Sequence, residues 1–516
     1  MILSELSQED NQYWFSRKDK KFLHQIDTFY YSIKLSNDFT YDTEDVSCLY
    51  LRKFFKKIKE QMGFGSVVPL DIPGIDTQLN VRPFKFDKFY NINIECPELF
   101  DIFIADTVPP GSDLGDSVTS EIIVQLRSYL LWQNGVTKAF EYSYNIVKAI
   151  CEHFDLEILE VKENRVDYCW HSNYLQNPEK YFRIDNFVEM QVSQFSRIRY
   201  DYQFKSNQEY ENDYIALGKR GNKCYVRIYL KTKEVVEQGY KSWFFKEWLF
   251  NGLISRYDNY VLEKAFVKKS WKYVDKARLE FYQEFGNNKA YVDECAAILS
   301  GELVKSNDYI ATLADKLTPR ITLVTNVEYQ TSRRFSKSFN FYELKNNKNK
   351  YDSPCQRIYD YLDNRRLIID YLTSRTLRLV VPDPNEANRS RLEYNAFWKA
   401  LRACRIVDVK KAPKDIKLVR DYSSQLNKER VKNNIISSLS TYSLYEKGLD
   451  NEDSAFADSA DFISSLNDND MQKFRQHKFK KSRLLNKKLD YGSPGATAHN
   501  YLIVNSDTGE ILGGGF

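Results

Sequence analysis

Cys224-Tyr-Val-Arg-Ile-Tyr-Leu-Lys231 alternates apolar and polar side chains along its whole length. Such alternation is typical of a β-strand with one buried face. Two further stretches share the pattern, Arg165-Val-Asp-Tyr-Cys-Trp-His171 and Ala277-Arg-Leu-Glu-Phe-Tyr-Gln-Glu284. We therefore predict three half-buried strands between residues 164 and 284, and we expect their polar sides to share one face of a sheet.

The polar sides of these strands carry chemically useful groups. They are Arg165, Asp167, His171, Tyr225, Arg227, Tyr229, Lys231, Arg278, Glu280 and Tyr282. If the strands adjoin, the face combines acids that could bind a metal, cations that could bind phosphate and a phenol that could act as a nucleophile. The alternative is a solvated sheet face with ordinary surface charge.

The neighbouring stretches indicate the fold class. Residues 196–204 and 213–218 also alternate, and Gly218-Lys-Arg-Gly-Asn222 predicts a hairpin turn into the next strand. Upstream, residues 120–154 predict two helices separated at Asn134-Gly135. The order favours an α+β fold in which an antiparallel-rich sheet has helices on one face.

The length of 516 residues predicts about three domains. We expect an N-terminal region of unclear type (1–110), an α+β catalytic domain (111–345), a helical, winged-helix-like region that could bind duplex DNA (346–430), and a low-order acidic linker with a basic tail (431–516). Residues 450–470 hold seven acids and no base, which is typical of a disordered linker. Residues 471–489 hold eight Lys or Arg, so they are either a polyanion-binding arm or a solvated helix.

Composition limits the classes of protein. The net charge is only +4, so any nucleic-acid surface must be local. The eight cysteines include no C-x-x-C pair, which argues against a zinc ribbon and against a disulfide framework. No apolar run reaches membrane length, and the N-terminus lacks the pattern of a signal peptide. We predict a soluble cytoplasmic protein without a membrane partner.

Common catalytic motifs are absent. The sequence has no Walker A loop, no His-Glu-x-x-His, no Gly-x-Ser-x-Gly and no histidine-hydrophobe-histidine triplet. A catalyst would therefore rest on carboxylates and tyrosine. The hard oxygen ligands of Asp167 and Glu280 would favour Mg²⁺ or Mn²⁺, and Arg227 and Lys231 flank Tyr229 at i±2, about 7 Å away along a strand.

These residues resemble a known family. Tyr214-Ile-Ala-Leu-Gly-Lys-Arg220, followed by Val226-Arg-Ile-Tyr-Leu-Lys-Thr-Lys-Glu234, is similar to the signature of the replication initiation factors of rolling-circle plasmids, the trans-acting class related to some conjugative-element relaxases. Arg165-Val-Asp167 and Arg278-Leu-Glu280 resemble two further motifs of that family. The resemblance covers about residues 137–285.

The resemblance implies a DNA-nicking replication initiator that uses a metal-assisted tyrosine transesterification and keeps a phosphotyrosine intermediate. Tyr229 would be the nucleophile, Arg227 and Lys231 would bind phosphate, and Asp167 and Glu280 would bind Mg²⁺ or Mn²⁺. The expected partners are origin DNA, single-stranded and duplex, with a host helicase and a second copy of the chain as further candidates. The element would be a plasmid or a phage.

Several assignments stay open at this stage. His171 stands where the family often has an acid, so it is either a third metal ligand or a cap on its strand. Tyr225 and Tyr282 are alternative nucleophiles, and Glu234 is either a ligand or a salt-bridge partner. The expected DNA-binding cations are Arg165, Lys219, Arg220, Arg278, Arg333, Arg334 and Lys337. The rival functions are a non-catalytic DNA-binding replication or regulatory protein and a structural protein of a mobile element.

Overall fold

The structure is a computed structural model of the whole chain. It describes residues 6–18, 21–35, 46–62, 66–86, 90–105, 120–195, 198–204, 210–336, 339–340, 354–386, 388–406, 419–420, 461–489, 502–504 and 511–514, with isolated positions between 432 and 442. The chain divides into two compact units, the first formed by residues 1–335 and 347–415 and the second by residues 336–346 and 416–516.

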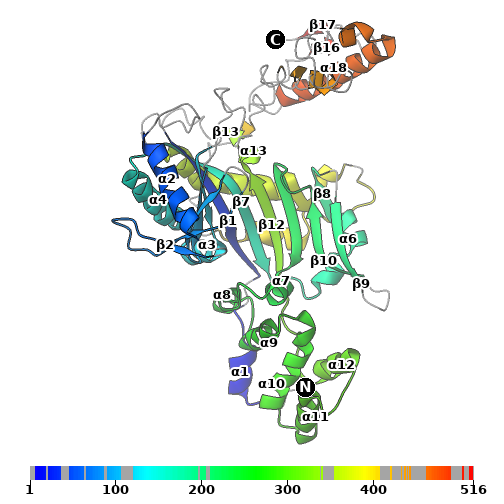
Figure 1. Cartoon of the computed structure of the whole chain (residues 1–516). Helices are drawn as coiled ribbons and strands as arrows, with labels where there is room; N and C mark the ends of the chain where they lie inside the picture. The colour runs from blue at the N-terminus through cyan, green and yellow to red at the C-terminus, as the bar shows by residue number, and fades with distance from the viewer. Residues whose placement is uncertain are drawn as a thin grey trace. The chain divides into compact units, whose positions relative to one another are not determined.

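A large antiparallel sheet dominates the first unit (Figure 1). In the described residues it has eleven strands in the order β2-β3-β4-β5-β6-β1-β7-β12-β11-β10-β9. The bounds are β1 Phe22–Leu35, β2 Val68–Leu70, β3 Leu79–Arg82, β4 Ile92–Cys96, β5 Phe100–Ile104, β6 Ile122–Leu126, β7 Ile158–Ser172, β9 Ile198–Phe204, β10 Tyr210–Leu217, β11 Cys224–Leu230 and β12 Thr325–Ser332. The predicted α+β class and the antiparallel sheet are confirmed.

Two long strands form the centre of the sheet. β1 and β7 pair over nearly their whole lengths, and a register shift between Ile26 and Thr28 leaves Asp27 without a partner residue on β7. Such a β-bulge locally redirects the strand. β7 also pairs with β12, which in turn pairs with β11, so residues 22–35 and 325–332 flank the predicted strand at residues 165–171.

The predicted hairpin is confirmed. β10 and β11 pair antiparallel, and the turn between them contains Gly218 and Gly221 with φ of 88° and 87°. A side chain is disfavoured at such positive φ, which explains the two glycines. The strand is one residue shorter than predicted, because Lys231 begins helix α7 (Lys231–Gln238).

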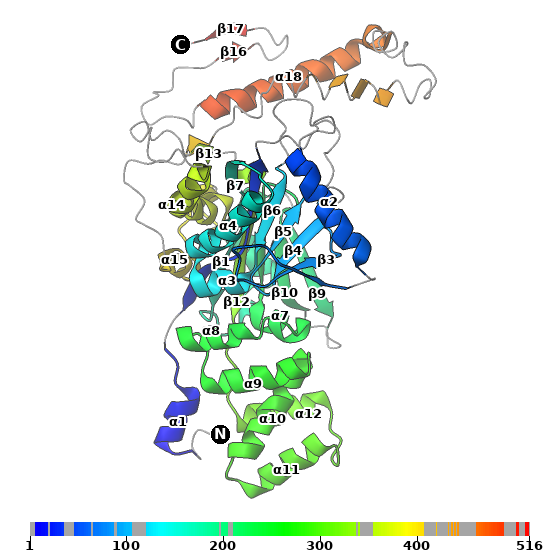
Figure 2. The ribbon, with the colours of Figure 1, turned by 60° about the vertical axis from the view of Figure 1, so that its left-hand side comes forward.

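Helices cover the apolar face of the sheet (Figure 2). They include α4 (Val136–His153), α14 (Gln356–Tyr371) and α15 (Ala396–Ala403). The Tyr361 hydroxyl contacts that of Tyr168 on β7 at 2.5 Å, and Tyr329 of β12 donates to the carbonyl of Leu377. Helices α14 and α15 therefore belong to the same unit as the sheet.

Two sequence predictions of secondary structure are wrong. The two helices predicted on either side of Asn134-Gly135 are present as α3 (Ser128–Asn134) and α4, but the first does not begin at residue 120. Residues 122–126 form strand β6 instead, because the β-branched Ile122-Ile-Val124 favours an extended chain. The stretch from Ala277 to Glu284 lies in helix α10 (Val274–Phe285), not in a strand.

Helix α10 belongs to a helical group beyond one end of the sheet (Figure 1). The group comprises α9 (Arg256–Val267), α10, α11 (Lys289–Ser300) and α12 (Asn307–Leu317), and α1 (Gln8–Phe15) packs its Trp14 against Phe281 and Tyr260. Its apolar core continues through α8 (Trp243–Asn251) to Cys169 of β7. The helical group is thereby fixed to the sheet.

Further elements complete the description. In the first unit these are α2 (Val46–Gln61), α5 (Pro178–Tyr181), α6 (Ile184–Met190), α13 (Arg333–Ser336) and a small sheet of β8 (Gln191–Ser193) with β14 (Leu377–Leu379). The second unit contains β13 (Phe339–Asn340) paired with β15 (Val419–Arg420), helix α18 (Asp468–Leu489), and β16 (Leu502–Val504) paired with β17 (Ile511–Gly514). No helix in the described ranges combines the length and the apolar content that crossing a bilayer requires.

Candidate active site

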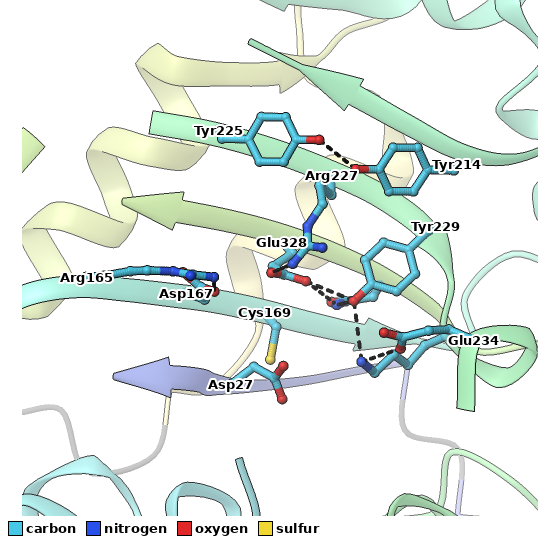
Figure 3. A network of polar contacts seen from close by, with 12 residues as sticks. Asp27, Arg165, Asp167, Cys169, Tyr214, Tyr225, Arg227, Tyr229, Glu234 and Glu328 are labelled. Atoms are coloured by element: carbon cyan, nitrogen blue, oxygen red, sulfur yellow. Dashed lines mark hydrogen bonds and ion pairs between the residues drawn. The ribbon is translucent and has the colours of Figure 1, made fainter. Parts of the chain in front are cut away.

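One face of the sheet carries a network of polar side chains from four adjacent strands (Figure 3). We call it the polar face; it consists of Asp27, Arg165, Asp167, Cys169, His171, Tyr225, Arg227, Tyr229, Asn326 and Glu328, with Lys231 and Glu234 of α7 at its end. Antiparallel register sets Arg227 opposite Glu328 and Tyr229 opposite Asn326. Directly opposed residues lie about 5 Å apart, so their side chains meet.

The hydroxyl of Tyr229 is the most connected group on this face. It donates a hydrogen bond to Oε2 of Glu328 at 2.9 Å, and it accepts bonds from Nδ2 of Asn326 at 2.9 Å and from Nζ of Lys231 at 3.3 Å. Burial and the charge of Glu328 raise the pKa of Tyr229 well above its ordinary value, while Lys231 works in the opposite direction. The phenol is therefore protonated at rest, with a carboxylate in place to receive its proton.

Two guanidinium–carboxylate pairs lie next to Tyr229. Arg227 binds Glu328, and Arg165 binds Asp167 through two contacts of 2.5 and 3.0 Å. The side chains of Glu328 and Asp167 are 1% and 2% exposed, whereas those of Arg227 and Arg165 are 19% and 35% exposed. The carboxylates are therefore buried and the arginines reach solvent, where an anion could meet them.

The ionisation of Asp167 is finely balanced. Burial raises its pKa to about 6, against the opposing effect of Arg165, and the charge of Glu328 raises it further. Burial also works against the charge of Arg165, yet the Asp167 carboxylate raises the pKa of that guanidinium. At neutral pH the ion pair is formed, and it weakens as the pH falls below about 6.

Two more ion pairs complete the network. Lys231 contacts Glu234 at 2.5 Å, and Lys241 lies 3.6 Å from Asp27. Burial would raise the pKa of Asp27, but the charges of Lys241 and Lys231 hold it below its ordinary value. Of the two roles considered for Glu234, the salt bridge is the one observed. Every carboxylate of the described polar face thus has a cationic partner.

Glu280, predicted to share the face with Asp167, lies elsewhere. It belongs to α10 in the helical group, where it accepts from the hydroxyl of Tyr273 and contacts Lys264 at 3.1 Å. Arg278 of the same helix is 3% exposed and binds Asp275 and Asp315. Both residues serve the helical group, and a buried Arg278 cannot contact DNA in this arrangement.

His171 lies on the polar face but is enclosed by aromatic rings. Its centroid is 4.7 Å from Trp132 and 5.1 Å from Phe244, and its Nδ1 accepts from Nε1 of Trp248 at 3.0 Å. Burial and the charge of Lys231 lower its pKa well below the ordinary value. A neutral imidazole with Nδ1 already bonded packs the end of β7 and is poorly placed to bind a metal.

The predicted metal set does not assemble. Asp167 and Glu280 are on different parts of the first unit, and His171 uses Nδ1 for Trp248. Asp27, Asp167 and Glu328 could supply carboxylate oxygens, but a cation already neutralises each of them. Among the described residues, no group of three or more His, Cys, Asp or Glu is arranged to hold an ion. The described residues, as they are arranged, therefore do not fit a resident divalent metal.

The predicted DNA-binding cations are found in different settings. Arg165 lines the polar face, and Lys219 and Arg220 are exposed in the β10–β11 turn. Arg334 is exposed at α13, whereas burial and the charge of Arg357 lower the pKa of neighbouring Arg333. Lys337 lies outside the described residues.

The alternative tyrosines also differ in place. Tyr225 lies on the polar face and bonds its hydroxyl to that of Tyr214 at 2.6 Å, away from Glu328 (Figure 3). Tyr282 is 1% exposed in α10, with its ring in the core of the helical group. The hydroxyl of Tyr229 contacts a carboxylate and a cation, whereas that of Tyr225 bonds to Tyr214.

Sequence reasoning missed Asn326 and Glu328. They belong to Thr325-Asn-Val-Glu-Tyr-Gln-Thr-Ser332, which alternates polar and less polar side chains as the predicted strands do. Val327 and Tyr329 are fully buried on the apolar side, and Asn326 and Glu328 face Tyr229. The alternation could therefore have predicted this strand and the polar side on which Asn326 and Glu328 lie.

Comparisons with known proteins give limited information. No protein-family model matches the chain, and no curated protein matches it. Among solved structures, the chain is similar to the rolling circle replication initiator protein from Geobacillus stearothermophilus, with 12% sequence identity and a TM-score of 0.33. The similarity covers 74% of this chain and 96% of that chain.

Proposed function

We propose that this protein cuts one strand of DNA by transesterification, with Tyr229 as the nucleophile, and that it initiates replication of a mobile element. The single observation that carries the proposal is the hydroxyl of Tyr229, held between the carboxylate of Glu328 and the ammonium of Lys231. The strand and turn motifs that resemble the rolling-circle initiation factors supply the substrate class.

The contacts around Tyr229 match what a phenol nucleophile needs. A phenol attacks phosphorus only as it loses its proton, and Glu328 accepts that proton at 2.9 Å. Lys231 and Asn326 then donate to the oxygen as negative charge develops on it. The Tyr229–phosphorus bond forms, the bond to the 3′ oxygen breaks, and that oxygen takes a proton from water to leave a 3′ hydroxyl and a tyrosyl 5′ phosphate.

The arginines at the rim supply the complementary charge. Arg227 and Arg165 are the partly exposed members of their ion pairs, so a phosphodiester can approach them without first unburying them. Guanidinium groups bind phosphate oxygens in a forked geometry. Binding of phosphate would draw Arg227 from Glu328 and make the carboxylate a better proton acceptor.

A second function is favoured by one observation. Tyr229 is only 8% exposed, and its network is balanced in charge. A non-catalytic protein that binds DNA on the rim of the sheet would need neither an exposed phenol nor a free acid. In this alternative the polar face is a structural network.

Nicking of supercoiled DNA distinguishes the two functions. The substrate is a plasmid carrying the coding sequence of this chain with its flanking DNA, incubated with Mg²⁺, with Mn²⁺ or with a chelator, because metal dependence stays a prediction. We expect open circles and a covalent protein–DNA adduct, and we expect Tyr229→Phe to abolish both.

Tyr225→Phe and Tyr282→Phe are the matched controls, since they remove the other candidate hydroxyls, and both should still form the adduct. An adduct that persists in Tyr229→Phe would refute the assignment of the nucleophile. Binding without nicking by the unmutated chain under all three conditions would establish the non-catalytic alternative.

A further inference from the structure

We propose that helix α18 is a second DNA-binding element, which holds the phosphodiester backbone of duplex DNA without reading its sequence. The assignment does not depend on nicking, because α18 belongs to the second unit and Tyr229 to the first. Figure 2 shows α18 as a long helix drawn in orange.

Beyond its first turn, helix α18 carries charged side chains of positive sign only. Residues 471–489 contain eight Lys or Arg and no acid; the cations are Lys473, Arg475, Lys478, Lys480, Lys481, Arg483, Lys487 and Lys488. The acids Asp468 and Asp470 lie in the first turn, where the helix dipole favours negative charge. The rest of the helix therefore presents a concentrated positive field.

The described part of α18 has no buried side. Each residue from Met471 to Lys478 is exposed, and these eight positions exceed two turns of helix. Side-chain contacts support the start of the helix, where Asn467 caps the amides of Asn469 and Asp470, and Lys473 contacts Asp470 at 3.3 Å. A solvated helix with repelling cations is marginal alone, so a polyanion would stabilise it.

The pattern of charges favours duplex DNA as the polyanion. At 100° per residue the eight cations are distributed around the whole helix, which suits a groove with phosphates on both sides. The 22 residues span about 33 Å, close to one turn of B-DNA. A membrane surface would instead need an uninterrupted apolar side, and here Lys478 follows Phe474 by four positions on the same side.

The test is the salt dependence of DNA binding by the full chain. The probe is a fluorescent 30-base-pair duplex of random sequence, and the variant is Lys473→Gln, Arg475→Gln and Lys478→Gln together. Glutamine preserves helix propensity, which circular dichroism checks. Each lost phosphate contact should reduce the slope of log K against log salt by about 0.9, so we expect a slope smaller by about 2 to 3 and a Kd at least about tenfold higher.

A control variant removes the same charge elsewhere. Lys53→Gln, Lys289→Gln and Lys305→Gln together change three exposed lysines outside α18. The proposal is overturned if the α18 variant keeps the slope of the unmutated chain, or if the control variant lowers it equally. Binding of the chain to anionic vesicles but not to the duplex would assign α18 to a membrane surface instead. Nicking by the α18 variant, measured separately, reports only on Tyr229.

Discussion

Arg165-Val-Asp167 and Arg278-Leu-Glu280 have the same pattern of an arginine, an apolar residue and an acid. The first lies on a strand and the second on a helix, so their side chains are arranged differently. On strand β7, Arg165 turns to Asp167 and pairs with it. On helix α10, Arg278 points into the helical group towards Asp315, and Glu280 points away to Lys264. Residues two apart share a side on a strand and are 200° apart on a helix.

An arginine and an acid two residues apart therefore do not show whether their side chains share a face. The periodicity of the surrounding residues must first identify the element as a strand or a helix. The buried positions of α10 are Val274, Ala277, Arg278, Leu279, Phe281 and Tyr282, and most of them recur at spacings of three and four over more than two turns. The eight residues from Ala277 to Glu284 fit both the helical spacing and the strand-like alternation of apolar and polar residues. So short a stretch cannot distinguish a helix from a strand. The longer window identifies the helix.

The largest effect is expected from replacing an acid of the polar face, compared with replacing an acid of the helical group. Glu328→Gln should lower the nicking rate by about 10²–10⁴-fold, because Tyr229 loses its proton acceptor while its hydrogen bond is preserved. Glu280→Gln should leave the rate within about twofold, since Glu280 contacts only the helical group. Single-turnover nicking measures both.

An equal loss of nicking rate in Glu328→Gln and Glu280→Gln would contradict the conclusion that Glu280 lies apart from the polar face. Asn326→Asp offers a further check, because it replaces a donor to the Tyr229 oxygen by a second acid. We expect slower nicking for this variant with DNA binding unchanged.

The next effect concerns stability in the helical region. Arg278→Met removes the partner of Asp275 and Asp315 and the donor to the carbonyl of Thr318. Fully buried pairs cost about 3–5 kcal/mol when broken, but these acids are 37% and 35% exposed, so we expect a loss of about 2–3 kcal/mol in the free energy of unfolding.

Urea unfolding followed by tryptophan fluorescence measures this loss. Nicking per folded molecule should be unchanged in Arg278→Met, since the polar face is intact. If nicking fell with no change in stability, Arg278 would act at the active site after all, as its motif suggested.

Much of the polar face could be predicted from sequence, and the rest could not for identifiable reasons. Alternation placed Asp167 on the polar side of β7 and Arg227 and Tyr229 on the polar side of β11, and the structure has them on the same face. Asp27 could not be placed, because it enters through a β-bulge on a strand about 140 positions from its partner. Such non-local pairing leaves no periodic signal.

The smallest effect, and the one that tests the strand motif alone, is the pH dependence of stability. The pKa of Asp167 is about 6 in the folded chain and about 3.8 when exposed, so between these values the folded state binds more protons than the unfolded state. Its contribution to stability is therefore fully present below pH 4 and is lost as the pH rises through 6.

Asp167→Asn removes this titration while preserving the shape of the side chain. The free energy of unfolding of the unmutated chain, relative to that of Asp167→Asn, should fall by about 1–2 kcal/mol between pH 4 and pH 7. A difference that instead grew with pH would mean that Arg165 outweighs burial at Asp167, and the strand motif would then be a simple stabilising salt bridge like those of the helical group.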